Sequence, residues 1–251
     1  MNGSAGAALS HVGSISILLA DTVRETVRRR LEWRILLEQT YHLGVRSLAI
    51  ATVTALFTGM VLALQTSYSL AAYGARTFVG DVVALSLVRE LGPVLTSLMV
   101  GGRVGAGITA EIGSMNVTEQ IDAIRAMAAS PVRKLVVPKV LAILIMLPIL
   151  VILANFVGII GGMIMAVTTL NQPAAFYLQH VIQALSLHDV MSGLGKTVFF
   201  GLFIALIACH NGLTATGGAD GVGRATTRTV VAASLSVLIS DFFLTKFFLS
   251  F

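Results

Sequence analysis

Long apolar stretches alternate with short polar segments along this chain. Formal charges are absent from residues 47–75, 140–188 and 197–219. Each stretch exceeds the roughly 20 residues that an α-helix needs to cross a bilayer. The alternating ten-residue strands typical of outer-membrane barrels are not seen. The pattern therefore predicts an all-α integral membrane protein.

The apolar stretches and the breaks between them predict five transmembrane helices. These helices are expected at about residues 48–70, 82–109, 136–168, 191–213 and 229–248. Asn171-Gln172-Pro173 breaks the chain after the third helix, and 174–187 reads as a short interfacial helix. A glycine-rich turn at 217–223 is expected to separate the fourth helix from the fifth.

Residues 21–42 combine alternating charge with apolar residues at helical spacing. The charged members are Arg24, Glu25, Arg28, Arg29, Arg30, Glu32, Arg34 and Glu38. This pattern predicts an amphipathic helix on the membrane surface, and the alternative is a soluble helix docked on a partner.

No basic start precedes the apolar residues 15–20, which argues against a cleaved signal peptide. Residues 1–42 thus form an N-terminal segment, and 43–251 form the membrane domain.

A polar connector at 110–134 contains a second amphipathic helix. Asn116 followed by Glu119 fits a helix N-cap with a carboxylate at the third helical position. Val117, Ile121, Ile124 and Ala128 then fall on one helical face. Two interpretations stay open: a coupling helix seated in a motor subunit, or a loop helix resting on lipid headgroups.

The composition agrees with membrane residence and sets the expected orientation. Hydrophobic residues make up 56% of the 251 residues and charged residues only 12%, with a mean hydropathy of +0.89. The net charge of +5 does not indicate nucleic-acid binding, because the basic residues lie at helix ends rather than in one patch. Among the Lys and Arg residues at helix ends, only Arg76, Lys196 and Lys246 fall on the side opposite the N-terminus. The positive-inside rule therefore predicts a cytoplasmic N-terminus and a periplasmic C-terminus.

Charges inside membrane helices are costly, and they usually mark a pathway or a binding site. Arg89, Glu90 and Arg103 lie within the second expected helix, and Lys196 lies near the outer end of the fourth. Arg89 and Glu90 are adjacent, so about 100° separates them around a helix and they cannot face one partner. Arg89 and Lys196 are candidates to hold an anionic headgroup, with Glu90 pairing to Lys196 or gating. The alternative is that all three reach the interface or form structural pairs.

Nothing in the chain indicates an enzyme, a cofactor or a metal site. The single Cys209 excludes an intrachain disulfide, and the five histidines show no metal-ligand spacing. Gly193–Thr197 resembles the end of a phosphate-binding loop, but its first glycine position is Val190. The glycine pairs Gly101/Gly105 and Gly158/Gly162 are expected to allow close helix packing.

Two long segments resemble the MlaE (YrbE-type) permease family. They are VALSLVRELGPVLTSLMVGGRVGAGITAEIGSMNVTEQIDAI at 83–124 and GVGRATTRTVV at 221–231. Members of that family are the membrane subunits of ABC systems that carry phospholipids across the Gram-negative envelope. The EAA-x3-G loop of many ABC importers is not present around Glu119, so no mechanism carries over from those importers.

The resemblance implies an architecture, partners and site residues. It implies an N-terminal interfacial helix, five spans and a cytoplasmic coupling helix, working as a homodimer in the inner membrane. Two ABC ATPases, a STAS-domain protein held through them and a hexameric MCE-domain protein would be the partners. The residues matching the family's lipid cavity are Leu62, Gln65, Leu70, Tyr73, Arg89, Glu90 and Lys196. Those matching its coupling helix are Asn116, Glu119, Gln120, Ile121, Asp122, Ile124 and Arg125.

The expected function is that of a non-catalytic permease moving phospholipids between the inner and outer membranes and so maintaining outer-membrane lipid asymmetry. ATP would be used by the partner ATPases. One alternative is a permease of the same architecture for another apolar cargo, such as a sterol or an organic solvent. Such a neutral cargo has no need of Arg89 or Lys196. Another is a non-transporting scaffold for an MCE-type protein.

Overall fold

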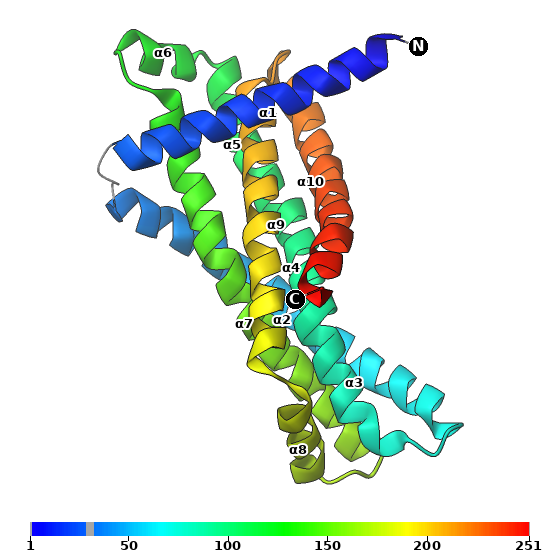
Figure 1. The fold of residues 1–251 in the computed structure, drawn as a ribbon. Helices are drawn as coiled ribbons and strands as arrows, with labels where there is room; N and C mark the ends of the chain where they lie inside the picture. The colour runs from blue at the N-terminus through cyan, green and yellow to red at the C-terminus, as the bar shows by residue number, and fades with distance from the viewer. Residues whose placement is uncertain (1, 29–32, 251) are drawn as a thin grey trace. The chain divides into compact units, whose positions relative to one another are not determined.

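A computed structural model describes residues 2–28 and 33–250, and all regular elements in those ranges are helices (Figure 1). The α-helices are α1 (Asn2–Arg28), α2 (Trp33–Ala71), α3 (Val79–Ser86), α4 (Gly92–Val100), α5 (Ala106–Val117), α6 (Gln120–Ala126), α7 (Val137–Thr168), α8 (Ala174–Ala184), α9 (Leu187–Leu213) and α10 (Gly218–Leu249). The shorter helical turns are η1 (Arg76–Phe78), η2 (Leu87–Leu91), η3 (Gly101–Gly105) and η4 (Val132–Val136).

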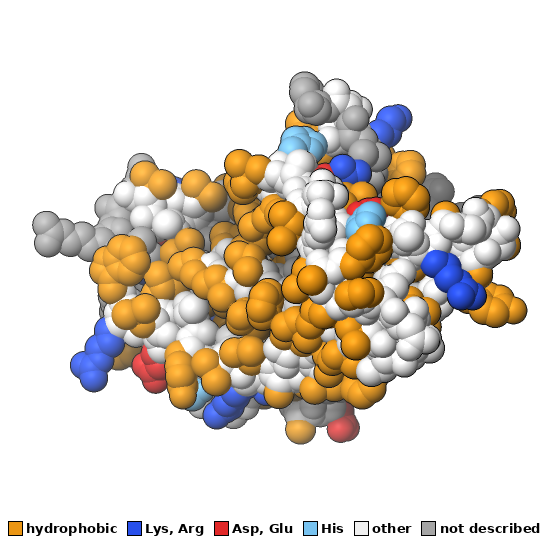
Figure 2. Space-filling model, turned by 90° about the horizontal axis from the view of Figure 1, so that it is seen from below, with side chains coloured by type: hydrophobic (Ala, Val, Ile, Leu, Met, Phe, Trp, Pro, Cys, Tyr) orange, Lys and Arg blue, Asp and Glu red, His pale blue; other side chains and the backbone are white. Residues whose placement is uncertain are grey.

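Among the described residues, five helical stretches are long and apolar enough to cross a membrane, which confirms the predicted number. They are Trp33–Ala71, Arg76–Val117, Val132–Thr168, Leu187–Leu213 and Gly218–Phe248. Large hydrophobic side chains on them are exposed, as expected where lipid replaces water as the surroundings. Figure 2, which views the molecule from below, shows hydrophobic and uncharged side chains with only a few charged ones among them.

The bounds predicted for the N-terminal helix, 21–42, are wrong, because α1 begins at Asn2 and α2 continues to Ala71. Helix α1 ends at Arg28 and α2 begins at Trp33, while Arg29, Arg30, Leu31 and Glu32 lie outside the described residues. The expected boundary at residue 42 falls inside α2, which continues to Ala71. No proline interrupts 33–71, so the polar first turns propagate directly into the first span.

The breaks between the later spans agree with the sequence at one place and differ at another. Asn171 adopts a positive φ of 53° and leads into Pro173, which ends the third span as predicted. The predicted turn at 217–223 is shorter than expected, because α10 already begins at Gly218. Only Gly217 (φ 90°) and Gly218 (φ 66°) need the left-handed conformation that glycine allows there.

The chain divides into two compact units. Unit 1 comprises Met1–Leu43, Val100–Met146 and Phe200–Ile239, and unit 2 comprises Gly44–Met99, Leu147–Phe199 and Ser240–Phe251. Polar contacts hold unit 1 together inside an apolar surrounding. Lys139, only 2% exposed, pairs with Glu111 at 2.6 Å and donates to Gln39 at 3.3 Å. Helix α1 of this unit contacts η4 (Figure 1).

Unit 2 buries an apolar core between α3, α8 and parts of α2 and α7. Helix α3 packs on α8 (Figure 1), and Val83 and Tyr177 are among the buried residues. Burial raises the pKa of the Tyr177 phenol. Asp81 and His180 join the same two helices at 3.1 Å.

Glycine permits two helices of unit 2 to approach each other closely. A Cβ added to Gly59 of α2 would overlap the backbone of Gly158 in α7. Gly158 itself faces Leu87, and Gly162 faces Val83 and Tyr177. In unit 1, Gly101 and Gly105 lie against Ile204. The Gly158/Gly162 pair therefore marks a place of close packing, whereas a Cβ at Gly101 or Gly105 would meet its neighbours at ordinary contact distance.

We expect Gly59→Ala to destabilise the protein by about 1–3 kcal/mol, because the added methyl must push two helix backbones apart. Gly107→Ala is the matched control, since nothing lies within 4 Å of a Cβ built there. Thermal unfolding of the detergent-solubilised protein, followed by helical circular dichroism, measures both variants. Equal melting temperatures would contradict the close approach of α2 and α7.

Candidate functional site

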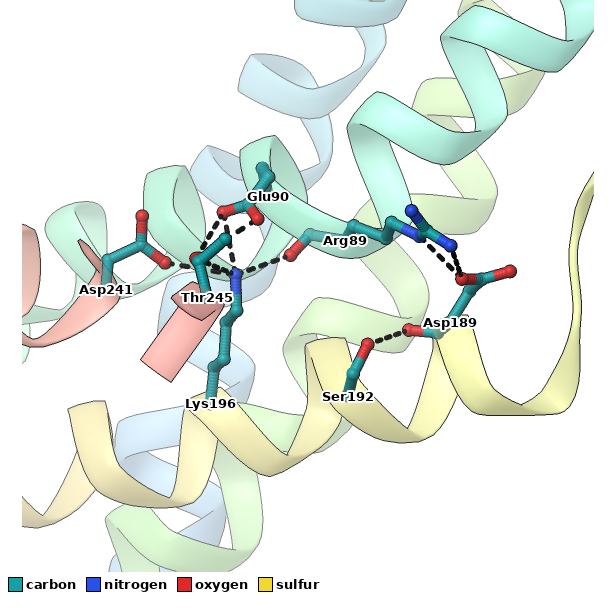
Figure 3. Close-up of polar contacts among 7 residues, drawn as sticks. All are labelled: Arg89, Glu90, Asp189, Ser192, Lys196, Asp241 and Thr245. Carbon is teal, nitrogen blue, oxygen red and sulfur yellow. Dashed lines mark hydrogen bonds and ion pairs between the residues drawn. The ribbon is translucent and has the colours of Figure 1, made fainter. Parts of the chain in front are cut away.

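Two of the three charged residues singled out in the second span lie in a widened helical turn of unit 2, whereas the third, Arg103, lies in η3 of unit 1. Arg89 and Glu90 belong to η2, a π-helical segment between α3 and α4. Such π-bulges recur at functional sites because they re-aim the side chains that they carry. Here the two neighbours point in different directions, as their spacing predicted (Figure 3).

Lys196 of α9 is the centre of the candidate site. Its side chain is 2% exposed, and Nζ lies 2.7 Å from Glu90 Oε2 and 3.3 Å from Asp241 Oδ1 of α10. The ammonium also donates to Thr245 Oγ1 at 2.6 Å and to the Arg89 carbonyl oxygen at 3.1 Å. Thr245 in turn donates to Glu90 at 3.2 Å. Lys196 thus joins the second, fourth and fifth spans (Figure 3).

Arg89 forms a separate pair with Asp189 at the start of α9. Its Nε and Nη2 both contact Asp189 Oδ1, and the carboxylate is 2% exposed whereas the arginine side chain is 42% exposed. Asp189 also accepts hydrogen bonds from the Ser186 amide at 2.8 Å and the Ser186 hydroxyl at 2.7 Å. The Ser186 hydroxyl accepts from the Asp189 amide at 3.3 Å, which completes a capping box. The hydrogen bonds at the start of α9 therefore hold the Asp189 carboxylate in place, and this carboxylate in turn orients Arg89.

The network as a whole contains two cations and three carboxylates. Lys196 is fully engaged by its partners, so it has no free face for a ligand. Arg89 and Glu90 differ, because their side chains are 42% and 38% exposed. Within the described residues, no group of three or more His, Cys, Asp or Glu side chains is arranged to hold a metal ion. The chemistry available is ionic recognition, with Arg89 as the accessible cation.

The four other residues predicted to line a lipid cavity fall into two classes. Leu62 and Leu70 pack against the buried cluster of Ala63, Val79, Val83 and Leu87. Gln65 is exposed, and Tyr73 is 84% exposed. In the described part of the chain, no hydrogen bond or ion pair links any of the four to the Lys196 network. Their role in a cavity stays a prediction.

Sequence reasoning missed Asp189, Asp241 and Thr245. Asp189 had a local signal, because Ser186-x-x-Asp189 directly before an apolar run is a capping-box pattern. Asp241 had the signal that identified Arg89, namely a single charge within an apolar span. Thr245 had none, since threonine is common in membrane helices and only the fold places it beside Lys196.

The predicted coupling segment lies in unit 1, and its predicted cap is wrong. Asn116 lies inside α5, where Nδ2 donates to the Ala215 carbonyl oxygen at 3.0 Å. Glu119 precedes α6 in a left-handed conformation (φ 61°) without a capping hydrogen bond. The α5 helix therefore continues past the expected start, because Asn116 finds its partner on another segment.

Helix α6 divides into an anchored side and an open side. Ile121 is fully buried and Ile124 is half-buried, whereas Gln120, Asp122 and Arg125 are exposed. Asp122 and Arg125 pair with each other at 2.7 Å. Ala128, expected on the apolar face, instead follows the helix in a left-handed conformation and is exposed.

Comparison with known proteins gives one consistent set of relatives. The family model described as Permease MlaE matches residues 36–247. A probable ABC transporter permease protein of Rickettsia conorii is 42% identical over 94% of this chain and 92% of its own length. A probable ABC transporter permease protein of Synechocystis is 46% identical over 86% and 82%. The intermembrane phospholipid transport system permease protein MlaE of Haemophilus influenzae is 42% identical over 86% and 83%.

We expect Lys196→Met to destabilise the protein by about 3–5 kcal/mol, because it leaves Glu90 and Asp241 without their counter-charge. Adding Asp241→Asn should recover part of that loss, since one uncompensated carboxylate is removed. Lys246→Met, an exposed position of α10, serves as the control. Thermal unfolding is the measurement, and a Lys196→Met protein as stable as Lys246→Met would contradict the network.

Proposed function

Because the chain belongs to the MlaE permease family, we propose that it is the membrane subunit of an ATP-driven transporter that moves phospholipids between two membranes. One observation carries the proposal. A cation, Arg89, is held partly exposed inside an apolar span. The name of a relative that matches 86% of this chain, a phospholipid transport permease, agrees with that observation.

The cargo proposal follows from the chemistry around Arg89. A guanidinium binds a phosphate with charge-assisted hydrogen bonds, which are the strongest that a side chain offers. The pair with Asp189 orients Arg89 while leaving 42% of its side chain accessible. Lys196 pairs with Glu90, as one of the sequence expectations had it, and it is buried among carboxylates. In this proposal it positions Glu90 and the Arg89 backbone. The apolar surfaces of the spans would accept the acyl chains.

The energy source in this proposal is a separate ABC ATPase, as the permease naming of the relatives implies. Helix α6 is the proposed contact, since Ile121 anchors it and its polar side is open. ATP can move the permease only if the ATPase binds two permease states differently. The further expected partners, a second copy of this chain, a STAS-domain protein and a hexameric MCE-domain protein, belong to the same proposal.

The proposed location is the inner membrane of a Gram-negative bacterium, with the N-terminus in the cytoplasm and the C-terminus in the periplasm. The clustering of Lys and Arg supports this orientation, because α6, η4 and the start of α10 then share the cytoplasmic side. The expected physiological result is maintenance of outer-membrane lipid asymmetry. A neutral cargo, such as a sterol, is the competing reading, but it gives no use for the exposed charge of Arg89.

Arg89 can be tested separately from its structural pair. We expect Arg89→Gln combined with Asp189→Asn to keep the fold but retain about tenfold less co-purified phospholipid, because one charged hydrogen-bond donor to phosphate is lost. Mass spectrometry of lipids bound to the purified complex measures this. Arg76→Gln, an exposed change in the same span, is the control. Normal lipid retention in the double variant would reduce Arg89 to a structural residue.

The coupling role of α6 predicts a charge-reversal phenotype. Arg125→Glu removes a surface pair worth at most about 1 kcal/mol, so folding should be unaffected. We expect the variant to bind its ATPase partner several-fold more weakly and to lose ATP-dependent transport. Pull-down of the ATPase and the ATPase rate of the complex report the change. Lys134→Glu, exposed outside α6, should behave as wild type, and an Arg125→Glu protein that does the same would contradict the assignment.

A further inference from the structure

The loop that carries α6 is closed at its base by one buried ion pair. Lys139, the third residue of α7, donates to Glu111 of α5 at 2.6 Å, and 28 residues separate the two in the chain. Helix α6 and η4 both lie between them. Among the described residues of unit 1, this is the one ion pair that joins two spans, because Asp122 and Arg125 pair within α6. The pair is therefore placed to link any movement of the loop to two spans at once.

The two members of the pair are held to different degrees. The Lys139 side chain is 3% exposed, whereas that of Glu111 is 54% exposed. The ammonium also donates to Gln39 of α2 at 3.3 Å, so it connects three spans. A buried ammonium gives up its carboxylate only at high cost, because its charge would then be uncompensated in an apolar interior. Lys139 is therefore the fixed member, and Glu111 must follow it when either helix moves.

Other contacts hold the loop on both sides of α6, but they lead to other elements. Asn116, near the end of α5, donates to the Ala215 carbonyl oxygen at 3.0 Å, and Ile121 of α6 is fully buried. On the other side, η4 contacts α1 and runs directly into α7. In the described part of the chain, the polar contact that joins α5 to α7 is the Lys139–Glu111 pair. A displacement of α6 thus reaches α5 along the chain, and the pair passes it to α7.

We propose that Lys139 is a positioning residue that makes α5, α6 and the start of α7 move as one body. This inference rests on the proposed function, since it takes an ATPase to act on α6. Lys139 does not touch that ATPase and acts through Glu111. With the pair intact, a displacement of α6 carries α5 and α7 with it, and Gln39 extends the movement to α2. Without the pair, α6 yields on its own, and ATP hydrolysis is no longer matched by movement of the spans.

Spin labels on α6 and α7 test the inference without any change at Lys139. Cysteines that carry the labels replace Ala126 and Ile145, both exposed, in a Cys209→Ser background. The complete complex is compared without nucleotide and with ATP and vanadate, which arrests the ATPase during hydrolysis. We expect the distance between the two labels to be the same in both states. A distance that changes with nucleotide in this otherwise wild-type protein would overturn the proposal.

The double variant Lys139→Met/Glu111→Gln removes both charges, so neither is left uncompensated. We expect it to fold and to bind the ATPase, but its label distance should now change with nucleotide. The number of ATP molecules hydrolysed per phospholipid transferred should rise about fivefold or more, the lower end of energetic coupling between sites. Lys139→Arg keeps the charge and should keep the wild-type ratio. Lys134→Met, which removes an exposed lysine of η4, should do the same.

Two results with the variants would overturn the proposal. One is a double variant with the wild-type ratio and an unchanged label distance, which would make the pair a structural contact only. The other is uncoupling by Lys139→Arg as strong as that of the double variant, because the charge would then not be what links the helices. A wild-type complex that hydrolyses ATP but transfers no phospholipid would contradict the proposed function instead, and the label distances would still decide the role of Lys139.

Discussion

A lysine buried in an apolar interior needs carboxylates beside it, and this requirement organises both units of the molecule. In unit 2, Lys196 gathers Glu90 and Asp241 from two other spans. In unit 1, Lys139 does the same with Glu111. Removing one partner of such a pair costs several kcal/mol, because the remaining charge is left without compensation. Helices that share no large soluble core are thereby tied together at defined positions along their length.

The ion pairs also give the charged residues of the membrane helices two different roles. Lys196 is fully engaged, whereas Arg89 is oriented by Asp189 and still partly exposed. Because Lys196 is buried and Arg89 is accessible, one network can both hold three spans together and offer a charged group to a ligand. A ligand can shift such a network between two arrangements only if it binds the two differently.

The sequence was sufficient for the parts of the fold that depend on length and local chemistry. Five spans, the break before Pro173 and the divergence of Arg89 from Glu90 could all be predicted. The partners of Lys196 could be predicted only in part: Asp241 carried the signal of a charge within a span, whereas Thr245 carried none and meets Lys196 only through the fold. The Asn116 cap failed for the same reason, since Ala215 offers that side chain a distant partner. Leu62 and Leu70 were assigned to a lipid cavity by resemblance alone; both pack against a buried cluster, and their cavity role stays a prediction.

The most direct test of the central claim is transfer of a fluorescent phospholipid by the complete complex, with its ATPase, between two populations of vesicles. The account predicts transfer that requires ATP hydrolysis, with a fluorescent sterol left behind under the same conditions. Efficient sterol transfer, or phospholipid transfer that proceeds without ATP, would contradict it.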